Sequence, residues 1–140
     1  MEFQVFSRSN AENYCKEPHN EKSIMISIKT PCDETRPNVN ITIDNNIMAI
    51  LKLAFDDVEE QYGDEKPISE LQAKQIVEFV EDYKDSIDLI IVHCDAGISR
   101  SAGVCAALSK WLVNEDKRFF SGYVPNMKCY NTVLNTAMLK

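Results

Sequence analysis

Four consecutive apolar residues at positions 89–92 (Leu-Ile-Ile-Val) constrain the fold more than any other feature of the chain. A strand with no polar side chain on either face is typical of the centre of a parallel sheet that helices cover on both sides. We predict this strand over residues 88–93. Beyond Gly97, a largely buried helix to about Asn114 is predicted by apolar residues at helical spacing: Ala102, Cys105, Leu108 and Leu112.

Two further segments are typical of strands. Residues 23–28 (Ser-Ile-Met-Ile-Ser-Ile) form a short β-prone run that a Thr-Pro pair closes. In residues 50–55, apolar side chains alternate with polar or small ones, and two aspartates follow the end of this strand. Residues 36–46 are predicted to form a loop, and residues 1–40 match no specific motif.

Two more helices are predicted. Ser69, followed three residues later by Gln72, is a capping-box pattern that marks a helix start. Apolar residues then recur at helical spacing: Ala73, Ile76, Val77, Val80 and Tyr83. A last helix is indicated by a similar series: Met127, Tyr130, Leu134, Ala137 and Met138. The alternation of strands and helices predicts an α/β fold, a three-layer sandwich with a mainly parallel central sheet, in a single domain over residues 1–140.

Composition and charge argue against several classes of protein. Of the 140 residues 44% are hydrophobic, enough for one globular core, and no apolar run approaches the roughly 18 residues of a membrane span. Five cysteines at irregular spacings and two histidines suggest neither a disulfide framework nor a zinc site, so we expect a cytoplasmic protein without a metal. A net charge of −7 disfavours nucleic-acid and membrane partners. We also expect a monomer.

The segment that joins the central strand to the next helix, residues 93–101, contains the candidate reactive residues of the chain. It lies at the carboxyl end of a central strand, where open α/β sheets bind ligands. A helix start offers unpaired amides and a partial positive charge, so a loop of successive amides leading into it can cradle an anion such as phosphate. The residues predicted to bind phosphate are Asp95, Ala96, Gly97, Ile98, Ser99 and Arg100.

Cys94 and Arg100 supply the reactive groups of this predicted site. Arg100 can bind two phosphate oxygens at once through its planar guanidinium, a geometry that lysine cannot reproduce. The amides, the helix dipole and the arginine all favour an anion at Cys94, which we expect to be a thiolate near neutral pH. A thiolate there can attack phosphorus and form a phosphocysteine intermediate, which water then hydrolyses.

Three neighbouring residues are assigned supporting roles. Ser101 can donate a hydrogen bond to the sulfur and stabilise it as the leaving group of the second step. His93 is expected to orient the loop and tune the thiolate rather than to transfer protons. For Asp95, we expect the amide to face the phosphate and the carboxylate to point outward, where its charge could bias substrate choice against acidic peptides or lipid head groups.

The order His-Cys-x-x-Gly-x-x-Arg-Ser in residues 93–101 resembles the signature of the protein tyrosine phosphatase superfamily, especially its compact dual-specificity-like members. Only Cys94, among the five cysteines, has an arginine six positions later. The resemblance covers this motif closely and, more loosely, the layout of residues 51–112. It implies a dual-specificity-like phosphatase domain whose mechanism needs no cofactor.

In that family an aspartate from a loop upstream of the cysteine protonates the leaving oxygen and then activates water. Residues 53–57 (Leu-Ala-Phe-Asp-Asp) resemble the strand end that presents it. Asp57 is preferred, because the family pattern places the acid two residues beyond an apolar position such as Phe55. Asp56 and Asp64 remain alternatives, and Asp57 could equally be a solvated turn residue or a helix cap.

The resemblance implies hydrolysis of phosphate monoesters in proteins, either of phosphotyrosine alone or also of phosphoserine and phosphothreonine. Residues 95–99 contain no lysine or arginine, which favours a phosphorylated protein or a small phosphate ester over a lipid or nucleic-acid phosphate. Two other functions stay open: a catalytically silent module that binds phosphorylated partners, and a sulfurtransferase of the rhodanese type.

Overall fold

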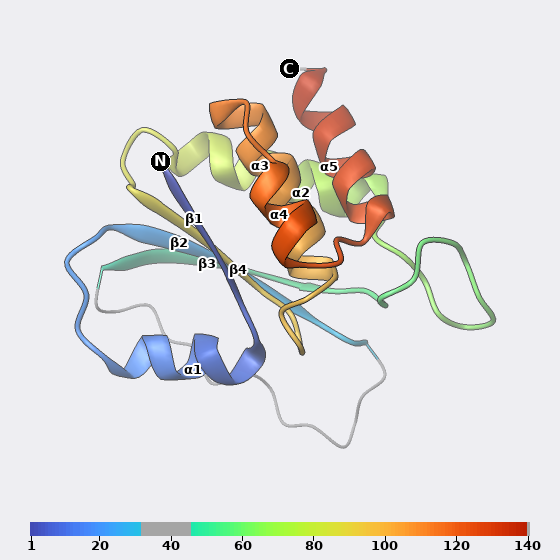
Figure 1. Cartoon of the computed structure of the whole chain (residues 1–140), viewed down its shortest axis with the longest axis horizontal. Coiled ribbons are helices and arrows are strands. Elements are labelled where there is room, and N and C mark those ends of the chain that lie inside the picture. The colour runs from blue at the N-terminus through green and yellow to red at the C-terminus, as the bar shows by residue number, and fades with distance from the viewer. Residues whose placement is uncertain (32–45, 140) are drawn as a thin grey trace.

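The computed structural model describes residues 1–31 and 46–139, so the loop predicted over residues 36–46 lies, apart from Asn46, outside the described residues. Within the described part of the chain, the sheet has four strands, all parallel, in the order β1-β4-β2-β3. Their bounds are β1 Glu2–Phe6, β2 Ser23–Lys29, β3 Ile47–Ala54 and β4 Leu89–His93. The predicted parallel sheet is confirmed, with β4 and β2 at its centre (Figure 1).

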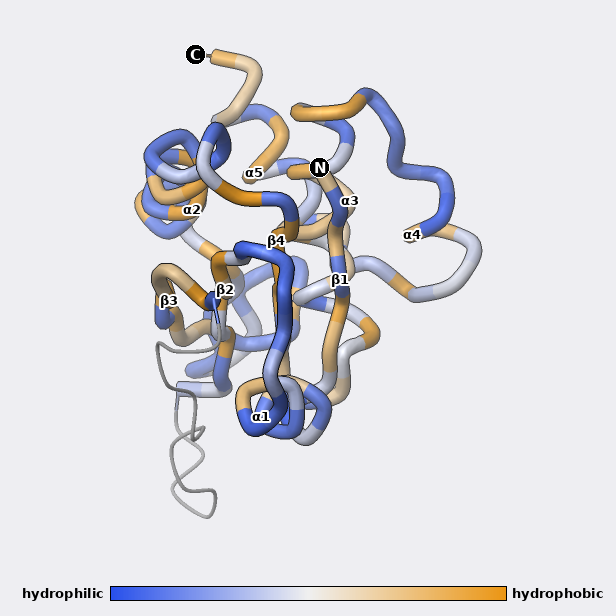
Figure 2. The backbone as a smooth tube through the Cα atoms, turned by 90° about the vertical axis from the view of Figure 1, so that its left-hand side faces the viewer, coloured by the Kyte–Doolittle hydropathy of each residue, from blue (hydrophilic) through white to orange (hydrophobic). Residues whose placement is uncertain are grey.

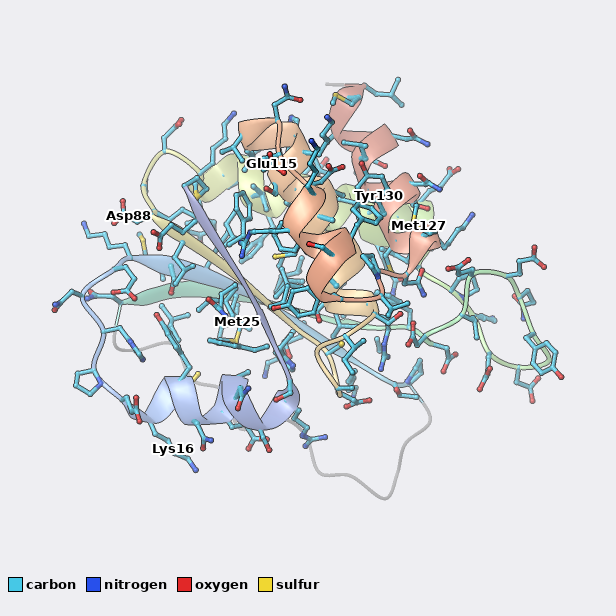
Figure 3. The ribbon with its side chains drawn as sticks, in the orientation of Figure 1. Lys16, Met25, Asp88, Glu115, Met127 and Tyr130 are labelled. Atoms are coloured by element: carbon cyan, nitrogen blue, oxygen red, sulfur yellow. The ribbon has the colours of Figure 1, made fainter. Side chains whose placement is uncertain are left out.

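Helices cover both faces of the sheet, as a three-layer sandwich requires. Helix α1 (Arg8–Lys16) lies on one face (Figure 1). The opposite face carries α2 (Glu70–Tyr83), α3 (Arg100–Val113), α4 (Lys117–Gly122) and α5 (Met127–Met138). In Figure 3, Met25 of β2 lies between the sheet and α1, whereas Lys16 points away from the sheet.

Strand β4 is buried along its whole length, which explains its unbroken apolar run. Ile90 and Val92 belong to the core shared with α2, α3 and α5, while Leu89 and Ile91 belong to the smaller core beneath α1. Figure 2 shows the hydrophobic colour along β4. Burial of each such side chain stabilises the fold by about 1.5–3 kcal/mol. Strand β4 therefore helps to hold the helices on both faces of the sheet.

Helix α2 begins with the predicted capping box. The Ser69 hydroxyl accepts from the Gln72 amide at 3.1 Å, and the Gln72 side chain accepts from the Ser69 amide at 3.0 Å. The Gln72 side-chain amide also donates to the Ala54 carbonyl at 2.9 Å. The cap therefore starts the helix and fastens it to the end of β3.

The sequence predictions missed β1, α1 and α4. In β1, Phe3 and Val5 are buried and alternate with exposed neighbours, but a five-residue edge strand gives only a short period-two pattern. In α1 the buried residues are Ala11 and Cys15, a stripe too narrow to produce a strong helical period. These elements depend on contacts with the rest of the fold more than on their own sequence.

All four strands run in the same direction, so their carboxyl ends meet at one edge of the sheet. The segments that leave this edge begin at Ser7 after β1, Thr30 after β2, Phe55 after β3 and Cys94 after β4. Residues far apart in sequence therefore surround the start of α3.

Candidate active site

The loop formed by residues 94–99, here named the phosphate loop, is held from outside through its carbonyl groups. Three of its carbonyl oxygens accept N–H bonds from neighbouring segments. These bonds run from Arg8 to Asp95 at 3.1 Å, from Val124 to Ile98 at 3.2 Å and from Asn126 to Ser99 at 2.9 Å. In a trans peptide the carbonyl and the following N–H point in opposite directions, and the described residues contain no cis peptide bond. The amides of Ala96, Ser99 and Arg100 therefore point into the loop, where an anion can accept them.

Gly97 allows the phosphate loop to pack against the junction of β1 and α1. Its φ of +72° lies in the left-handed region that favours glycine. A β-carbon at this position would lie 2.5 Å from the Ser7 nitrogen and 2.6 Å from the Phe6 carbonyl carbon. The Gly97 amide donates to Cys94 Sγ at 3.3 Å. The glycine thus turns the chain and directs an N–H at the sulfur.

Cys94 lies at the base of the phosphate loop, with 3% of its surface exposed. Its Sγ is 3.1 Å from Ser101 Oγ in the first turn of α3. Because α3 begins at Arg100, the positive end of its dipole faces the loop. The structure therefore brings the predicted nucleophile and its serine together at a helix start.

His93, the last residue of β4, is fully buried beneath the loop. Its Nδ1 lies 3.2 Å from the Cys94 carbonyl, and its Nε2 lies 2.6 Å from Ser27 Oγ. Burial lowers the pKa of His93, although the bond to the Cys94 carbonyl opposes this shift. In the neutral ring, Nδ1 donates to the carbonyl and Nε2 accepts from the serine hydroxyl, because a carbonyl can only accept. This geometry suits the orienting role expected for His93.

Arg100 is also buried, with 5% of its surface exposed, and its guanidinium contacts three groups. Nη1 donates to the Phe55 carbonyl at 2.8 Å and to Thr30 Oγ1 at 3.2 Å. Nη2 donates to Asp95 Oδ2 at 3.2 Å. The Nε–H group is buried without a hydrogen-bond partner among the described residues. An unpartnered buried donor at this place needs an acceptor, and a phosphate oxygen would supply one.

The Asp95 carboxylate differs from the expectation that it points outward. It accepts from Arg100 and, at 3.0 Å, from Thr30 Oγ1, and only 20% of its side chain is exposed. A nearby guanidinium offers the carboxylate a stronger interaction than solvent does, so the side chain turns back over the loop. Its charge is therefore engaged within the site.

The three candidate acids occupy different positions. Asp57 Oδ1 accepts from Ser99 Oγ at 2.8 Å and from Asn126 Nδ2 at 2.9 Å, so this carboxylate is bound to the phosphate loop. Asp56 accepts from the Lys66 amide at 2.8 Å and closes its own loop. Asp64 is exposed in a turn. Asp57 is the candidate whose position suits proton transfer at the phosphate loop.

The family model of the dual specificity phosphatase catalytic domain matches residues 8–118, most of the chain. The chain belongs to this family. The match includes the phosphate loop and all three candidate acids, and it makes the domain a phosphatase catalytic domain by family. No curated protein matches the sequence.

Several solved structures share the fold at low sequence identity. Human DUSP28 is 14% identical, with a TM-score of 0.63 over 98% of this chain and 92% of that one. The human tyrosine phosphatase-like serine/threonine/tyrosine-interacting protein is 16% identical, with a TM-score of 0.58 over 85% and 78%. PTPMT1, solved in complex with PI(5)P, is 18% identical, with a TM-score of 0.57 over 84% and 78%. These likenesses support the dual-specificity-type α/β fold.

The phosphatase site includes residues that the sequence analysis missed. Thr30 contacts Arg100, Ser27 contacts His93, and Asn126 contacts both Asp57 and the phosphate loop. Thr30 follows a predicted strand, so the rule that selected Asp57 could have selected it as well. Asn126 precedes a predicted helix as an N-cap, but its second contact arises only from the packing of α5.

Metal-binding clusters, membrane-spanning helices and grooves were also sought in the described part of the phosphatase domain. Among the described residues, no group of three or more His, Cys, Asp or Glu side chains could hold a metal ion. In the same part of the chain, no helix is both long and apolar enough to cross a membrane. A groove of about 960 Å³ lies between α2, α5 and residues 61–69, and no residue of the phosphate loop lines it.

Proposed function

We propose that this phosphatase hydrolyses phosphate monoesters on proteins, most of all phosphotyrosine and also phosphoserine or phosphothreonine, through a phosphocysteine on Cys94. One observation carries the proposal. The Cys94 sulfur lies beneath inward-facing amides, at the start of a helix whose first residue, Arg100, keeps a buried N–H donor that has no partner in the described part of the chain. This combination suits a bound phosphate with its phosphorus above the sulfur.

In the first step, the Cys94 thiolate attacks phosphorus, forming a P–S bond as the ester P–O bond breaks. Asp57 donates a proton to the leaving oxygen, so the alcohol or phenol departs neutral. The inward amides and Arg100 bind the three equatorial oxygens, whose charge they stabilise in the transition state. The bonds from Ser99 and Asn126 support this role for Asp57, because they hold its carboxylate beside the loop.

In the second step, water attacks the phosphocysteine and the P–S bond breaks. Asp57, now ionised, accepts a proton from the water, and inorganic phosphate forms. The departing sulfur takes the electron pair of the P–S bond, and a hydrogen bond from Ser101 at 3.1 Å stabilises the thiolate. His93 keeps the loop in place through the Cys94 carbonyl.

The surroundings of the site support a protein substrate. The phosphate loop contributes Asp95 and no lysine or arginine, so it offers no extra positive charge to a polyphosphorylated head group. Ile98 is 50% exposed and Val124 is 72% exposed, and a backbone hydrogen bond joins them. Apolar side chains at the rim suit a phosphotyrosine ring or a peptide side chain. PTPMT1 was solved with PI(5)P, so that lipid is the competing substrate to test.

The decisive experiment is hydrolysis of para-nitrophenyl phosphate under reducing conditions, across roughly pH 5 to 8, by the wild type and Cys94→Ser. Cys15→Ser, which changes a buried thiol on the sheet-facing side of α1, is the matched control. We expect activity in the wild type and the control and none in Cys94→Ser. Phosphotyrosine and phosphoserine peptides are then compared with PI(5)P, and preference for the lipid would contradict the protein substrate.

Two outcomes would replace the proposed reaction. If the wild type binds inorganic phosphate or vanadate without turnover, the domain is a catalytically silent phospho-binding module. If it binds neither anion but turns over thiosulfate, the sulfurtransferase alternative applies.

A further inference from the structure

We infer that Asp95 and Thr30 form a positioning pair for Arg100, which fixes one edge of the guanidinium so that the other edge faces the phosphate. This inference rests on the proposed function, because it assigns the two residues to the phosphate-binding step. Neither side chain needs to touch the substrate. They act through the arginine. Thr30 directly follows β2 and lies 64 positions before Cys94 in the sequence.

The side chains of Thr30, Asp95 and Arg100 are hydrogen-bonded to one another in a ring. A carboxylate can only accept, so the single hydroxyl proton of Thr30 is donated to Asp95 Oδ2, at 3.0 Å. The Thr30 oxygen then has lone pairs free to accept from Arg100 Nη1, at 3.2 Å. Asp95 Oδ2 also accepts from Arg100 Nη2, at 3.2 Å. Thr30 thereby links the two charged groups in one fixed orientation.

The donors of Arg100 show which edge remains for phosphate. A guanidinium has five N–H groups in one plane, two on each Nη and one on Nε. Both Nη1 hydrogens have acceptors, Thr30 Oγ1 and the Phe55 carbonyl. Thr30 and Asp95 oxygens lie next to each other, so they occupy the edge that Nη1 and Nη2 share. Among the described residues, the edge formed by Nε and the second Nη2 hydrogen is left, and Nε is buried there without a partner.

That remaining edge is the one that binds two oxygens of a phosphate side by side. A rotation of the guanidinium would turn it away from the loop, and the fixed edge opposes such a rotation. The backbone of the phosphate loop is held by other bonds, from Arg8, Val124 and Asn126. Loss of the Thr30 hydroxyl should therefore disturb the arginine more than the loop.

The test is a double-mutant cycle on oxyanion binding, with sodium tungstate as the probe and calorimetry as the readout. Thr30→Val removes the hydroxyl at nearly constant shape, and Thr30→Ser restores it. Each is made in the wild type and in Arg100→Lys, since lysine has no guanidinium edge to orient. Thr136→Val, which removes a hydroxyl from α5, is the matched control. Kinetics with para-nitrophenyl phosphate are measured on the same proteins.

We expect Thr30→Val to weaken tungstate binding about tenfold, the scale of a lost hydrogen bond to a charged group. Thr30→Ser should stay within about twofold of the wild type, and Thr30→Val should change the Arg100→Lys protein by less than about twofold. An equal loss in both backgrounds would overturn the inference, as would no loss in the wild type. If Thr30→Val does not fold, Asp95→Asn takes its place, and its effect must likewise disappear in Arg100→Lys.

Failure of this inference can be separated from failure of the proposed function. If turnover depends on Cys94 but Thr30→Val binds tungstate as tightly as the wild type, the positioning pair is wrong and the phosphatase reaction stands. If the wild type shows no turnover, yet Thr30→Val weakens tungstate binding when residue 100 is arginine and not when it is lysine, the positioning pair stands and the proposed reaction is wrong. If the wild type does not bind tungstate, both are overturned.

Discussion

The phosphate loop and the contact between α3 and α5 each bury a cysteine, in very different surroundings. Cys94 in the loop is 3% exposed, and its sulfur contacts a serine hydroxyl and a backbone amide. Cys129 on α5 is 1% exposed and packs against Gly103 of α3. Burial, followed by the charge of Asp57, raises the pKa of Cys129 well above its ordinary value, so this thiol stays protonated.

The comparison teaches that burial alone does not make a reactive thiol. Cys105, fully buried within α3, behaves like Cys129, since burial raises its pKa to about 12. The surroundings of Cys94 are different, since the carboxyl end of β4 places its sulfur at a helix start, against a serine hydroxyl and a backbone amide, rather than inside a helix. Substitutions in the phosphate loop should therefore reduce turnover, and substitutions between α3 and α5 should reduce stability.

The largest effect is expected for Arg100→Lys. The change keeps a positive charge but removes the planar edge, so kcat/KM for para-nitrophenyl phosphate should fall about 10³-fold, the scale of a lost transition-state donor. Arg118→Lys, on α4 and outside the site, is the matched control and should retain activity within about threefold. Steady-state kinetics and thermal melting of both proteins test this. An active Arg100→Lys enzyme would remove the arginine from the proposed mechanism.

A smaller loss of turnover is expected for Asp57→Asn. Without a proton donor, kcat for phenyl phosphate near pH 6 should fall about 10²–10³-fold. The loss should be much smaller for para-nitrophenyl phosphate, whose leaving oxygen needs little protonation. Asp56→Asn and Asp64→Asn, at the alternative acids, should show no such dependence on the leaving group. Equal losses on both esters would assign the acid to another residue.

Gly103→Ala addresses the contact between α3 and α5. An added β-carbon would lie 2.5 Å from the Asn126 carbonyl oxygen and 2.9 Å from Cys129 Cβ, so the helices must separate. We expect the free energy of unfolding to fall by about 1–3 kcal/mol, the usual cost of overpacking. Gly122→Ala, where a β-carbon would meet no atom within 4 Å, is the matched control. Urea unfolding measures both, and an unchanged Gly103→Ala protein would contradict the tight contact.

The parts of this molecule that could be predicted from sequence are those with local signals. The apolar run of β4 predicts that this strand is buried on both faces, and the pair of Ser69 and Gln72 predicts where α2 begins. Thr30 and Asn126 stand at the end of a predicted strand and before a predicted helix, but these positions do not say what the side chains contact. Their bonds with Arg100 and Asp57 exist only once distant strands and helices are packed together. The motif thus revealed the reactive residues, and the fold revealed the residues that position them.

The smallest predicted effect concerns His93, at the base of the phosphate loop. Its pKa is lowered by burial in the folded protein, so below its ordinary value of about 6.5 the unfolded chain binds a proton that the folded chain resists. The stability that the neutral ring contributes is complete above about pH 6.5 and is lost as the pH falls toward the lower folded pKa, by at most about 1.4 kcal/mol for each pH unit.

Urea unfolding of the wild type and His93→Asn at about pH 7.5 and pH 5.5 measures this contribution. The variant loses hydrogen bonds at either pH, so the informative quantity is the change in unfolding free energy between the two pH values. We expect that change to be smaller in His93→Asn, because asparagine does not titrate. The matched control is His19→Asn, which removes the other histidine of the chain, a half-buried ring beyond α1 that stacks on Tyr14. Equal changes in all three proteins would mean that His93 ionises as freely in the folded chain as in the unfolded one, which its buried position against Ser27 argues against.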